Sequence, residues 1–263
     1  MLSNADFLRY SRQLMLPVCG EAGIKRLQRS HVVVIGAGGL GSISAAYLAA
    51  AGVGQLTIID DDCVELSNLP RQWLYQAVDV GAPKADCLAA ALETINTDTN
   101  VRAIKHRFEL SNAATIIDQA DLLLDCTDNL ATRQHINEFC LNTHLPWVFA
   151  AAIGFQSHCM ALHPSRIKAA EHGCLHCLYP FNELPAGRCA EQGVLGPAVG
   201  LAASMQASLA LRALWQDPQL PWGQLWQSDQ LSFAHHTLQV PNDSGCTVCH
   251  RHSTHDVIEE LGA

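Results

Sequence analysis

The sequence predicts an α/β protein with a Rossmann-like, mostly parallel sheet that carries helices on both faces. One observation is the stretch VVVIGAGGLGSISAAYLAAAGVGQLTIID at 32–60, where an apolar run leads into glycines, a small-residue helix and a second apolar run. The other is the alternation of apolar runs with segments of helical periodicity as far as residue 153. Such alternation is typical of βαβ units, whose crossover helices place parallel strands side by side.

The elements up to residue 153 follow from apolar periodicity and from the positions of Pro and Gly. Residues 3–29 are expected to form a basic helical segment, followed by a strand at 32–36 and a helix at 40–52. The next expected elements are a strand at 55–60, a helix after Pro83 at 84–96, a strand at 101–110, a short helix at 111–120, a buried strand within 121–129, a helix at 129–144 and a strand at 146–153.

The pattern changes after residue 153. Residues 154–163 and 223–240 predict antiparallel additions to the sheet, and 197–215 predicts a long helix of small residues. Residues 164–195 are rich in Cys, His, Pro and Gly, so we expect mostly loop there. A single domain over 1–263 with an antiparallel C-terminal extension is therefore expected.

The composition argues against several kinds of partner. The 263 residues carry a net charge of -9, whereas a nucleic-acid partner would need a basic face. No apolar run reaches the roughly 18 residues of a membrane span, so no membrane association is expected. The start, MLSNADFLRYSRQ, has no apolar signal core, which favours a cytoplasmic location. The eleven cysteines are then expected to be thiols, some of them bound to metal.

The glycines after the first strand predict a nucleotide site. Gly36 permits a tight turn, Gly38 allows the backbone to approach a phosphate, and Gly41 permits close packing of helix against strand. Asp60, at the end of the second strand, can accept hydrogen bonds from ribose hydroxyls. This pattern leaves the nucleotide open, and an NAD-dependent dehydrogenase remains an alternative of a different class.

A second group of polar residues stands at Ser67-Asn68-Leu69-Pro70-Arg71-Gln72 and at Lys84. A dehydrogenase needs no further cations here, because the helix N-terminus already serves the pyrophosphate. An enzyme that splits ATP does need them, since charge builds on the leaving pyrophosphate. Arg71 and Lys84 suit that task, although they could also be ordinary surface charges on a loop.

The third group, Asp125-Cys126-Thr127-Asp128-Asn129, ends a predicted parallel strand. Ligands of open α/β sheets bind at this edge. Asp128 could hold Mg²⁺ against triphosphate oxygens, since hard cations prefer carboxylates. Asp128 or Asn129 could instead cap the following helix. Cys126 is interpreted as a core residue.

Two Cys-x-x-Cys pairs indicate a metal site. Four thiolates suit a tetrahedral Zn²⁺, and two such pairs in loops favour a structural metal over a redox dithiol. Nearby histidines are alternative ligands. The predicted ligands are Cys174, Cys177, Cys246 and Cys249, and the histidines are His172, His176, His250 and His252. Separately, Cys189 stands beside Arg188, a cation that can lower a thiol pKa.

Together these motifs resemble the ThiF/MoeB (HesA) family, bacterial relatives of the ubiquitin-activating enzymes. The resemblance covers nearly the whole chain: RYSRQ, GAGGLG, the acidic run into LSNLPRQ, PK at 83–84, DCTDN, and both cysteine pairs in order. It implies an adenylyltransferase that binds Mg-ATP and activates the C-terminal Gly-Gly carboxylate of a ubiquitin-like sulfur carrier protein, usually as a homodimer. It also implies a nucleotide-binding half at about 1–153, a carrier-binding and zinc half at about 154–250, and a polar tail at 251–263.

The resemblance also assigns roles to individual residues. It implies that Gly39 and Asp60 hold the nucleotide, that Asn68, Arg71 and Lys84 contact the phosphates, and that Asp128 is essential for Mg²⁺ and adenylation. Arg12 would reach the phosphates from the partner subunit. Cys189 would match the loop cysteine that can link covalently to the carrier, and the four paired cysteines would match the zinc ligands.

Within the family, IDDDCVELSN, DCTDNLATRQHIN and the loop CLYPFNELPAGRCAEQGVLGP look more like the thiamine branch, with a ThiS-type carrier. The molybdopterin branch, with a MoaD-type carrier, is the alternative, and a sulfur-transfer protein is a further candidate partner. A non-catalytic zinc scaffold would leave Arg71, Lys84 and Asp128 without a role. Pro70 departs from the family's NLQRQ, and proline removes a backbone donor from that loop.

Overall fold

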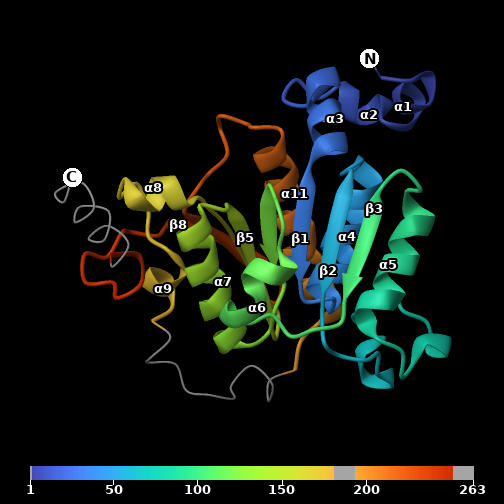
Figure 1. Ribbon diagram of the computed structural model, residues 1–263. Helices are drawn as coiled ribbons and strands as arrows, with labels where there is room; N and C mark the ends of the chain where they lie inside the picture. Colours follow the sequence, from blue (N-terminus) through green and yellow to red (C-terminus); the bar gives the residue numbers. More distant parts are fainter. Residues whose placement is uncertain (1, 181–192, 251–263) are drawn as a thin grey trace.

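A computed structural model describes residues 2–180 and 193–250. It contains an eight-stranded sheet with the strand order β3-β2-β1-β4-β5-β6-β7-β8 (Figure 1). Strands β1 to β5 pair in parallel, whereas β6, β7 and β8 are joined antiparallel. Their bounds are β1 His31–Ile35, β2 Gln55–Ile59, β3 Asn100–Ile104, β4 Leu122–Asp125, β5 Trp147–Ile153, β6 Gln156–Leu162, β7 Gln224–Asp229 and β8 Ala234–Gln239. The expected mixed, mostly parallel sheet is confirmed.

Helices cover both faces of this sheet, and short 3-10 turns lie in the connection after β2. The helices are α1 Asn4–Arg9, α2 Ser11–Leu14, α3 Gly20–Arg29, α4 Gly39–Ala51, α5 Lys84–Ile95, α6 Leu110–Ile116, α7 Leu130–Thr143, α8 Pro164–Lys168, α9 Leu175–Leu178 and α11 Gly196–Leu214, and the 3-10 turns are η1 Leu66–Asn68 and η2 Ala77–Asp79. Within the described residues, no helix is both long enough and apolar enough to cross a membrane.

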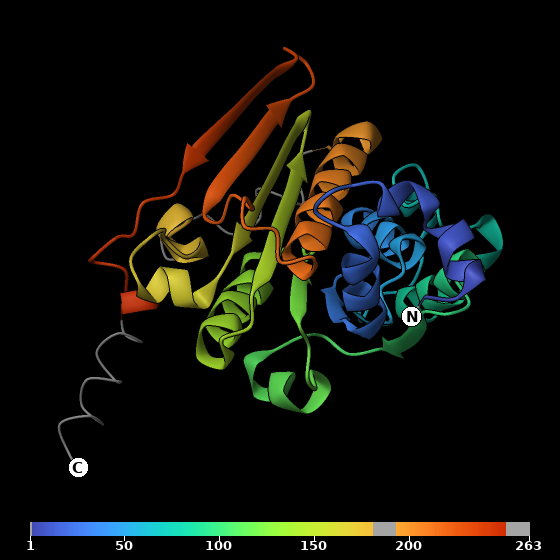
Figure 2. The same ribbon diagram turned by 90° about the horizontal axis from the view of Figure 1, so that it is seen from above.

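The side chains of the central strands alternate between two hydrophobic cores. Val32 and Val34 of β1 join the core beneath α3, α4, α5 and α11, whereas Val33 and Ile35 join the core beneath α6, α7 and α9. All five residues of β1 are buried, and Val32 to Ile35 are apolar, as expected of a strand covered on both faces. Figure 2 shows α11 on one side of the sheet and α7 on the other.

The sheet direction sets the two ends of the molecule apart. The parallel strands all end at one edge of the sheet, the carboxyl edge. In the sheet, β1 lies between β2 and β4, so the strand order reverses at β1. Ligands of open α/β sheets bind where the strand order reverses in this way. The helices α1, α2 and α3 lie at the opposite end, beyond the start of β1 (Figure 1).

One sequence-based expectation is wrong. The strand expected at 101–110 is β3, which ends at Ile104 because its partner β2 ends at the paired residue Ile59. Residues 164–195 are mostly loop where they are described, as expected, although the short helices α8 and α9 also form there. The expected antiparallel additions at 154–163 and 223–240 are confirmed as β6 and the β7–β8 hairpin.

One buried glutamine ties α11 to the centre of the sheet. Gln206 is fully buried, and its Nε2 donates to the carbonyl oxygens of Asp125 and Val148, each at 2.9 Å. Its Oε1 accepts from Ser44 Oγ at 2.9 Å and from Cys126 Sγ at 3.2 Å. A single side chain therefore forms hydrogen bonds with β4, β5 and α4. Burial of its polar amide costs little free energy only while every partner is present.

We expect Gln206→Leu to lower the free energy of unfolding by about 2–5 kcal/mol, because it leaves buried carbonyl groups without a donor. Ser208→Ala, at an exposed position of the same helix, should change it by less than about 0.5 kcal/mol. Denaturant unfolding of both variants checks this. Equal stability of the two variants would contradict the role given to Gln206.

Candidate functional site

The glycine turn between β1 and α4 forms the floor of the candidate site. Gly36 has a φ of +94°, and a Cβ there would lie 2.8 Å from the carbonyl oxygen of Cys126. A Cβ on Gly41 would overlap the carbonyl oxygen of Gly36. Both positions therefore require glycine, the first for its dihedral angle and the second for the close approach of α4 to β1.

The N-terminus of α4 is open toward the carboxyl edge of the sheet. Gly38 is its N-cap and offers no side chain to the first N–H groups, which have no acceptor within the helix. Gly39 packs against the next loop, since a Cβ there would lie 2.7 Å from both the carbonyl oxygen of Arg71 and Val199 Cγ1. Uncapped N–H groups and the positive end of the helix dipole suit a phosphate.

Asp60 follows β2 and is bonded to the glycine turn. Its Oδ2 accepts from the Ala37 N–H at 2.6 Å, and its Oδ1 accepts from the Asp62 N–H at 2.8 Å. Burial raises the pKa of Asp60 above the usual carboxyl range, an effect that these two hydrogen bonds and Lys84 oppose. The carboxylate thus faces the glycine turn.

The segment after Asp60 brings two cations to this edge. Lys84 is buried, and its Nζ pairs with Asp62 Oδ2 at 2.8 Å. Arg71 is partly exposed, and its Nη1 donates to the carbonyl oxygen of Ser67 at 3.1 Å. Asn68 is buried and accepts from the Glu65 N–H through Oδ1 at 3.2 Å. Lys84 is therefore fixed near Asp60, whereas Arg71 lies along its own loop.

The loop after β4 shows which of Asp128 and Asn129 caps the following helix, a choice that the sequence left open. Asn129 caps α7, because its Oδ1 accepts from the Thr132 N–H at 2.8 Å. Asp128 is exposed and has no recorded hydrogen bond or ion pair with any residue in the described ranges. Cys126 is a core residue, as expected, and burial raises the pKa of its thiol well above the usual value. The Asp128 carboxylate is therefore available to a ligand.

Sequence reasoning missed the buried pair that supports this loop. Asp125 has no exposed surface, and its Oδ2 lies 3.9 Å from Arg133 Nε. Arg133 Nη2 donates to the carbonyl oxygen of Thr127, and the guanidinium lies 4.9 Å from the centre of the Phe149 ring. Burial raises the pKa of Asp125 and Arg133 opposes that rise. The only sequence signal was an acid at the last position of an apolar strand.

Gln72 is a second residue that sequence reasoning quoted without giving it a role. Its side chain is buried, and its Nε2 lies 3.6 Å from the position that a Cβ of Gly38 would take. Its Oε1 has no hydrogen-bond partner among the described residues. A buried amide beside the glycine turn adds a polar group to the floor of the site.

The two Cys-x-x-Cys pairs come together on the α7 side of the sheet. The Sγ atoms are 3.9 Å apart for Cys174 and Cys177, 3.8 Å for Cys174 and Cys246, and 3.6 Å for Cys177 and Cys249. Tetrahedral zinc with bonds of about 2.3 Å separates its sulfurs by about 3.8 Å, so the four thiols fit such an ion. No histidine belongs to this cluster among the described residues.

Two predicted residues are not part of this arrangement. Arg12 is exposed in α2, at the end of the molecule opposite the carboxyl edge of the sheet (Figure 1). Within one chain it does not meet the other predicted residues. Cys189 lies outside the described residues, as does the polar tail at 251–263.

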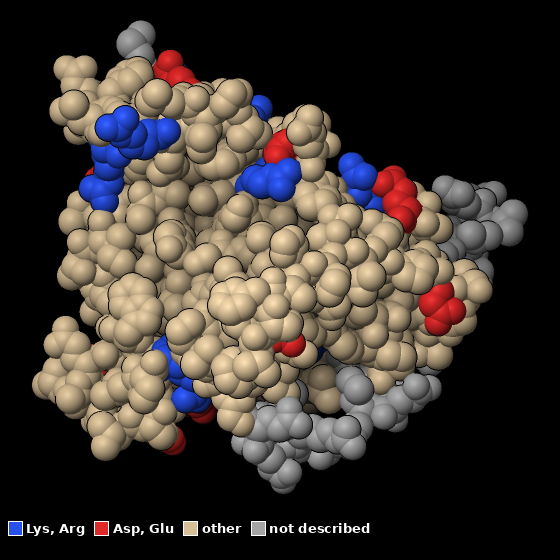
Figure 3. Space-filling view, turned by 180° about the vertical axis from the view of Figure 1, so that it is seen from behind, with Lys and Arg blue, Asp and Glu red and all other residues tan. Residues whose placement is uncertain are grey.

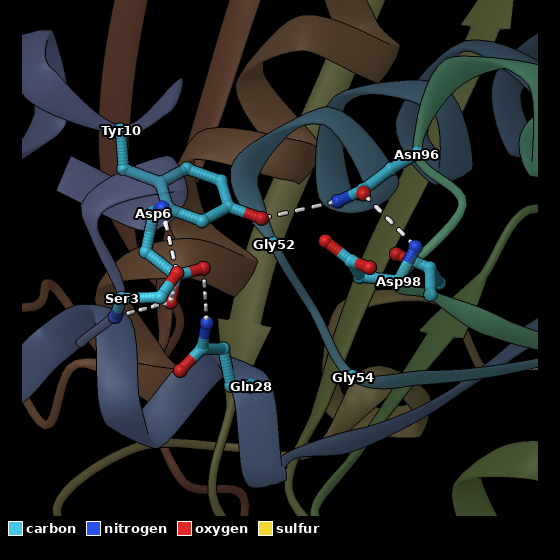
Figure 4. A pocket seen from close by; sticks show the side chains of 9 residues that line it. Ser3, Asp6, Tyr10, Gln28, Gly52, Gly54, Asn96 and Asp98 are labelled. Carbon is cyan, nitrogen blue, oxygen red and sulfur yellow. Dashed lines mark hydrogen bonds between the residues drawn. The ribbon is translucent and has the colours of Figure 1, made fainter. Parts of the chain in front are cut away.

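A polar hollow of about 340 Å³ lies beside the N-terminal helices (Figure 4). Its polar groups already bond one another: Asp6 accepts from Gln28 at 3.0 Å, and Asn96 donates to the Tyr10 hydroxyl at 3.2 Å. Its lining includes Asp98 and no lysine or arginine, so it does not suit a phosphate. We assign this hollow to the anchoring of α1 and α3 on the sheet.

Comparison with known proteins places this arrangement in context. The ThiF family profile matches residues 10–248. The sulfur carrier protein ThiS adenylyltransferase of Escherichia coli (strain K12) is 40% identical over 248 residues, covering 94% of this chain and 97% of that protein. The molybdopterin-synthase adenylyltransferase of Salmonella typhimurium is 34% identical over 248 residues, covering 94% and 98%.

Solved structures share the fold at lower sequence identity. Escherichia coli MccB, crystallised with ATP, superposes with a TM-score of 0.79 and is 20% identical. The match covers 94% of this chain and 74% of MccB. At this identity the similarity concerns the fold alone.

We expect Gly41→Ala to lower the free energy of unfolding by about 1–3 kcal/mol and to weaken nucleotide binding, because the added methyl forces α4 away from β1. Gly193→Ala is the matched control, since a Cβ there meets nothing within 4 Å. Denaturant unfolding and calorimetric titration with ATP measure both effects. If the two variants behave alike, the close approach at Gly41 is not needed.

Proposed function

The chain belongs to the ThiF family, and we propose that it is an ATP-dependent adenylyltransferase that activates the C-terminal Gly-Gly carboxylate of a ubiquitin-like sulfur carrier of the ThiS type for thiamine thiazole biosynthesis. The observation that carries this proposal is the placement of Lys84 and Asp128. Lys84 pairs with Asp62 next to Asp60, and Asp128 comes two residues after Cys126, whose carbonyl faces Gly36. Neither residue belongs to the pattern that any dinucleotide site would need. An NAD-dependent dehydrogenase would leave both residues without a role.

ATP would lie across the carboxyl edge between β1 and β4. Asp60 would hold the ribose, and the N–H groups around Gly38 and Gly39 would receive phosphate oxygens. Arg71 and Lys84, with Ser67 and Asn68 of the same loop, would meet the β- and γ-phosphates. The pairing of Lys84 with Asp62 supports this role, because it holds a buried cation beside the pocket.

The proposed reaction is an in-line transfer at the α-phosphorus. A carboxylate oxygen of the carrier's last glycine forms a bond to the α-phosphorus, the bond to the bridging oxygen breaks, and pyrophosphate leaves with its electron pair. The attacking group is already an anion, so positioning and charge neutralisation suffice and no general base is required. Removing Arg71 or Lys84 would therefore slow the chemical step.

Asp128 would hold Mg²⁺, which neutralises charge on the triphosphate when bound. The exposure of its carboxylate, together with the assignment of the helix cap to Asn129, supports this role. Asn129 then fixes the start of α7, and Arg133 fixes the carbonyl of Thr127. The chain thus holds the backbone on both sides of Asp128.

The carrier would dock on the hairpin tips at the same edge. Phe155 is 44% exposed, and Leu231 and Phe233 are 71% and 90% exposed, so the β5–β6 and β7–β8 turns present an apolar surface. The two turns are joined, because the Gln230 N–H donates to the carbonyl oxygen of Phe155. A flexible Gly-Gly tail could run from this surface to the glycine turn.

The four-cysteine cluster would hold a structural Zn²⁺, and the fit of its sulfur spacings supports that assignment. None of the ten described cysteines forms a disulfide, which suits a reducing compartment such as the cytoplasm. Cys189 would link covalently to the carrier as a thioester, formed when its thiolate attacks the adenylated glycine carbonyl and AMP leaves, with a sulfur-transfer protein as a further partner. Because molybdopterin-synthase adenylyltransferases are also similar, a MoaD-type carrier is the alternative substrate.

The chain would act as a homodimer through the face formed by α4 and α11. These outer helices contain a single charged residue, Arg212, in the last turn of α11. Tyr47 of α4 is 53% exposed and Leu201 of α11 is 38% exposed. Figure 3 shows few charged side chains over the middle of this face. Outer helices of a monomer normally carry charges, so a second copy is the expected cover, and Arg12 would then reach the partner's phosphates.

We expect carrier-dependent exchange of labelled pyrophosphate into ATP, with a ThiS-type carrier more active than a MoaD-type carrier. Asp128→Asn should reduce the exchange at least about 100-fold, because it keeps the side-chain shape and removes the charge. Asp118→Asn, an exposed position before β4 instead of after it, is the matched control and should retain the wild-type rate.

Each alternative result has a distinct meaning. Exchange only with a MoaD-type carrier would move the chain to the molybdopterin branch. Exchange that persists in Asp128→Asn would remove Asp128 from the chemistry. The absence of exchange with either carrier would contradict the proposed function.

We expect two inactive variants, Arg12→Ala and Asp128→Asn, to restore exchange when they are mixed, because a mixed dimer regains one intact site. Random mixing of equal amounts should give about one quarter of the wild-type sites. Subunits are first dissociated in dilute denaturant and then refolded together. Tyr47→Glu in both chains should prevent dimerisation and therefore abolish the restoration. If mixing Arg12→Ala with Asp128→Asn restores no exchange, Arg12 does not act in the partner's site.

A further inference from the structure

We propose that Asn137 of α7 is a positioning residue of the metal centre, whose side-chain amide donates a hydrogen bond to the Cys174 thiolate. This inference rests on the proposed metal site. Asn137 Nδ2 lies 3.8 Å from Cys174 Sγ, and Asn137 Oδ1 accepts from the Leu175 N–H at 3.0 Å. The amide therefore contacts two consecutive residues, Cys174 and Leu175, at the start of the first Cys-x-x-Cys motif.

Both partners of the contact between Asn137 and Cys174 are buried. Asn137 and Cys174 have no exposed surface, so water cannot replace either partner. Asparagine is an unusual residue at a fully buried helix position unless its amide is satisfied. Here the Nδ2 and Oδ1 atoms both have partners, and both partners belong to the α9 segment that carries the cysteines.

The charge of the centre explains why a donor is needed. Four thiolates carry more negative charge than one Zn²⁺ ion balances, and three of these cysteines are buried. A buried excess charge is costly unless hydrogen-bond donors face it. An N–H group directed at a sulfur lowers this cost and fixes the ligand, as donors around metal ligands generally do.

A purely structural role for Asn137 makes a different prediction. If the side chain only anchored the α9 segment, the acceptor bonded to Leu175 would be its essential part. Asn137→Asp keeps that acceptor and nearly the same shape, but it removes the donor and places a carboxylate beside a thiolate. Tolerance of this substitution therefore separates anchoring from metal positioning.

The position of Asn137 on α7 also links the metal centre to the candidate site. Asn129 caps this helix, Arg133 holds the loop that precedes it, and Asn137 follows one turn later on the same side. One rigid helix thus contacts both the Asp128 loop and the cysteine cluster. Release of the metal should loosen the support of that loop.

The test is the transfer of Zn²⁺ from the intact, zinc-loaded protein to a chromophoric chelator. We expect Asn137→Asp to weaken zinc binding by about 10- to 100-fold relative to the wild type. Asn142→Asp adds the same charge at an exposed position of the same helix and should retain wild-type affinity. Asn137→Ala, which removes the donor without adding charge, should give an intermediate loss.

A variant that fails to fold does not stop the test, because the wild type provides a second measurement. With a spin-active cadmium isotope in place of zinc, NMR should detect coupling from the metal to a side-chain amide proton of Asn137 and none to Asn142. Equal zinc affinity in all variants, or no coupling, would overturn the role of Asn137. A wild-type protein that binds no zinc would instead overturn the proposed metal site.

Discussion

The candidate site depends on the close contact between the first turn of α4 and the ends of β1 and β4. Gly41 lets α4 reach the carbonyl of Gly36, and Gly36 in turn lies against the backbone of Cys126. This contact brings an uncapped helix N-terminus, the Asp60 carboxylate and the loop carrying Asp128 to the same edge. The two strands belong to opposite halves of the sheet order, so the site exists only where they meet.

Buried polar side chains then hold the surrounding layers in register. Gln206 joins α11 to β4 and β5, Arg133 joins α7 to the loop after β4, and Asn137 joins α7 to the cysteine cluster. Each of these groups is costly to bury without its partners. Together they support the backbone near Asp128 from both faces of the sheet, which suits a reaction that depends on positioning.

Much of this arrangement follows from the sequence. Continuous apolar runs predicted β1, β2, β4 and β5, and the glycine spacing predicted the turn before α4. The length of β3 could not be predicted, because its end is set by pairing with β2. The partners of Asp125 and Cys174 could not be predicted either, since Arg133 and Asn137 resemble ordinary helix residues until the fold brings them to those loops.

The most direct measurement is the intact mass of a ThiS-type carrier after incubation with the chain and Mg-ATP. Adenylation predicts a carrier that gains one adenylyl group at its C-terminal glycine, and a carrier without that glycine should gain nothing. Pyrophosphate should appear in equal amount. An unmodified carrier, with ATP left intact while NAD binds at the glycine turn, would contradict adenylation and would indicate a redox enzyme instead.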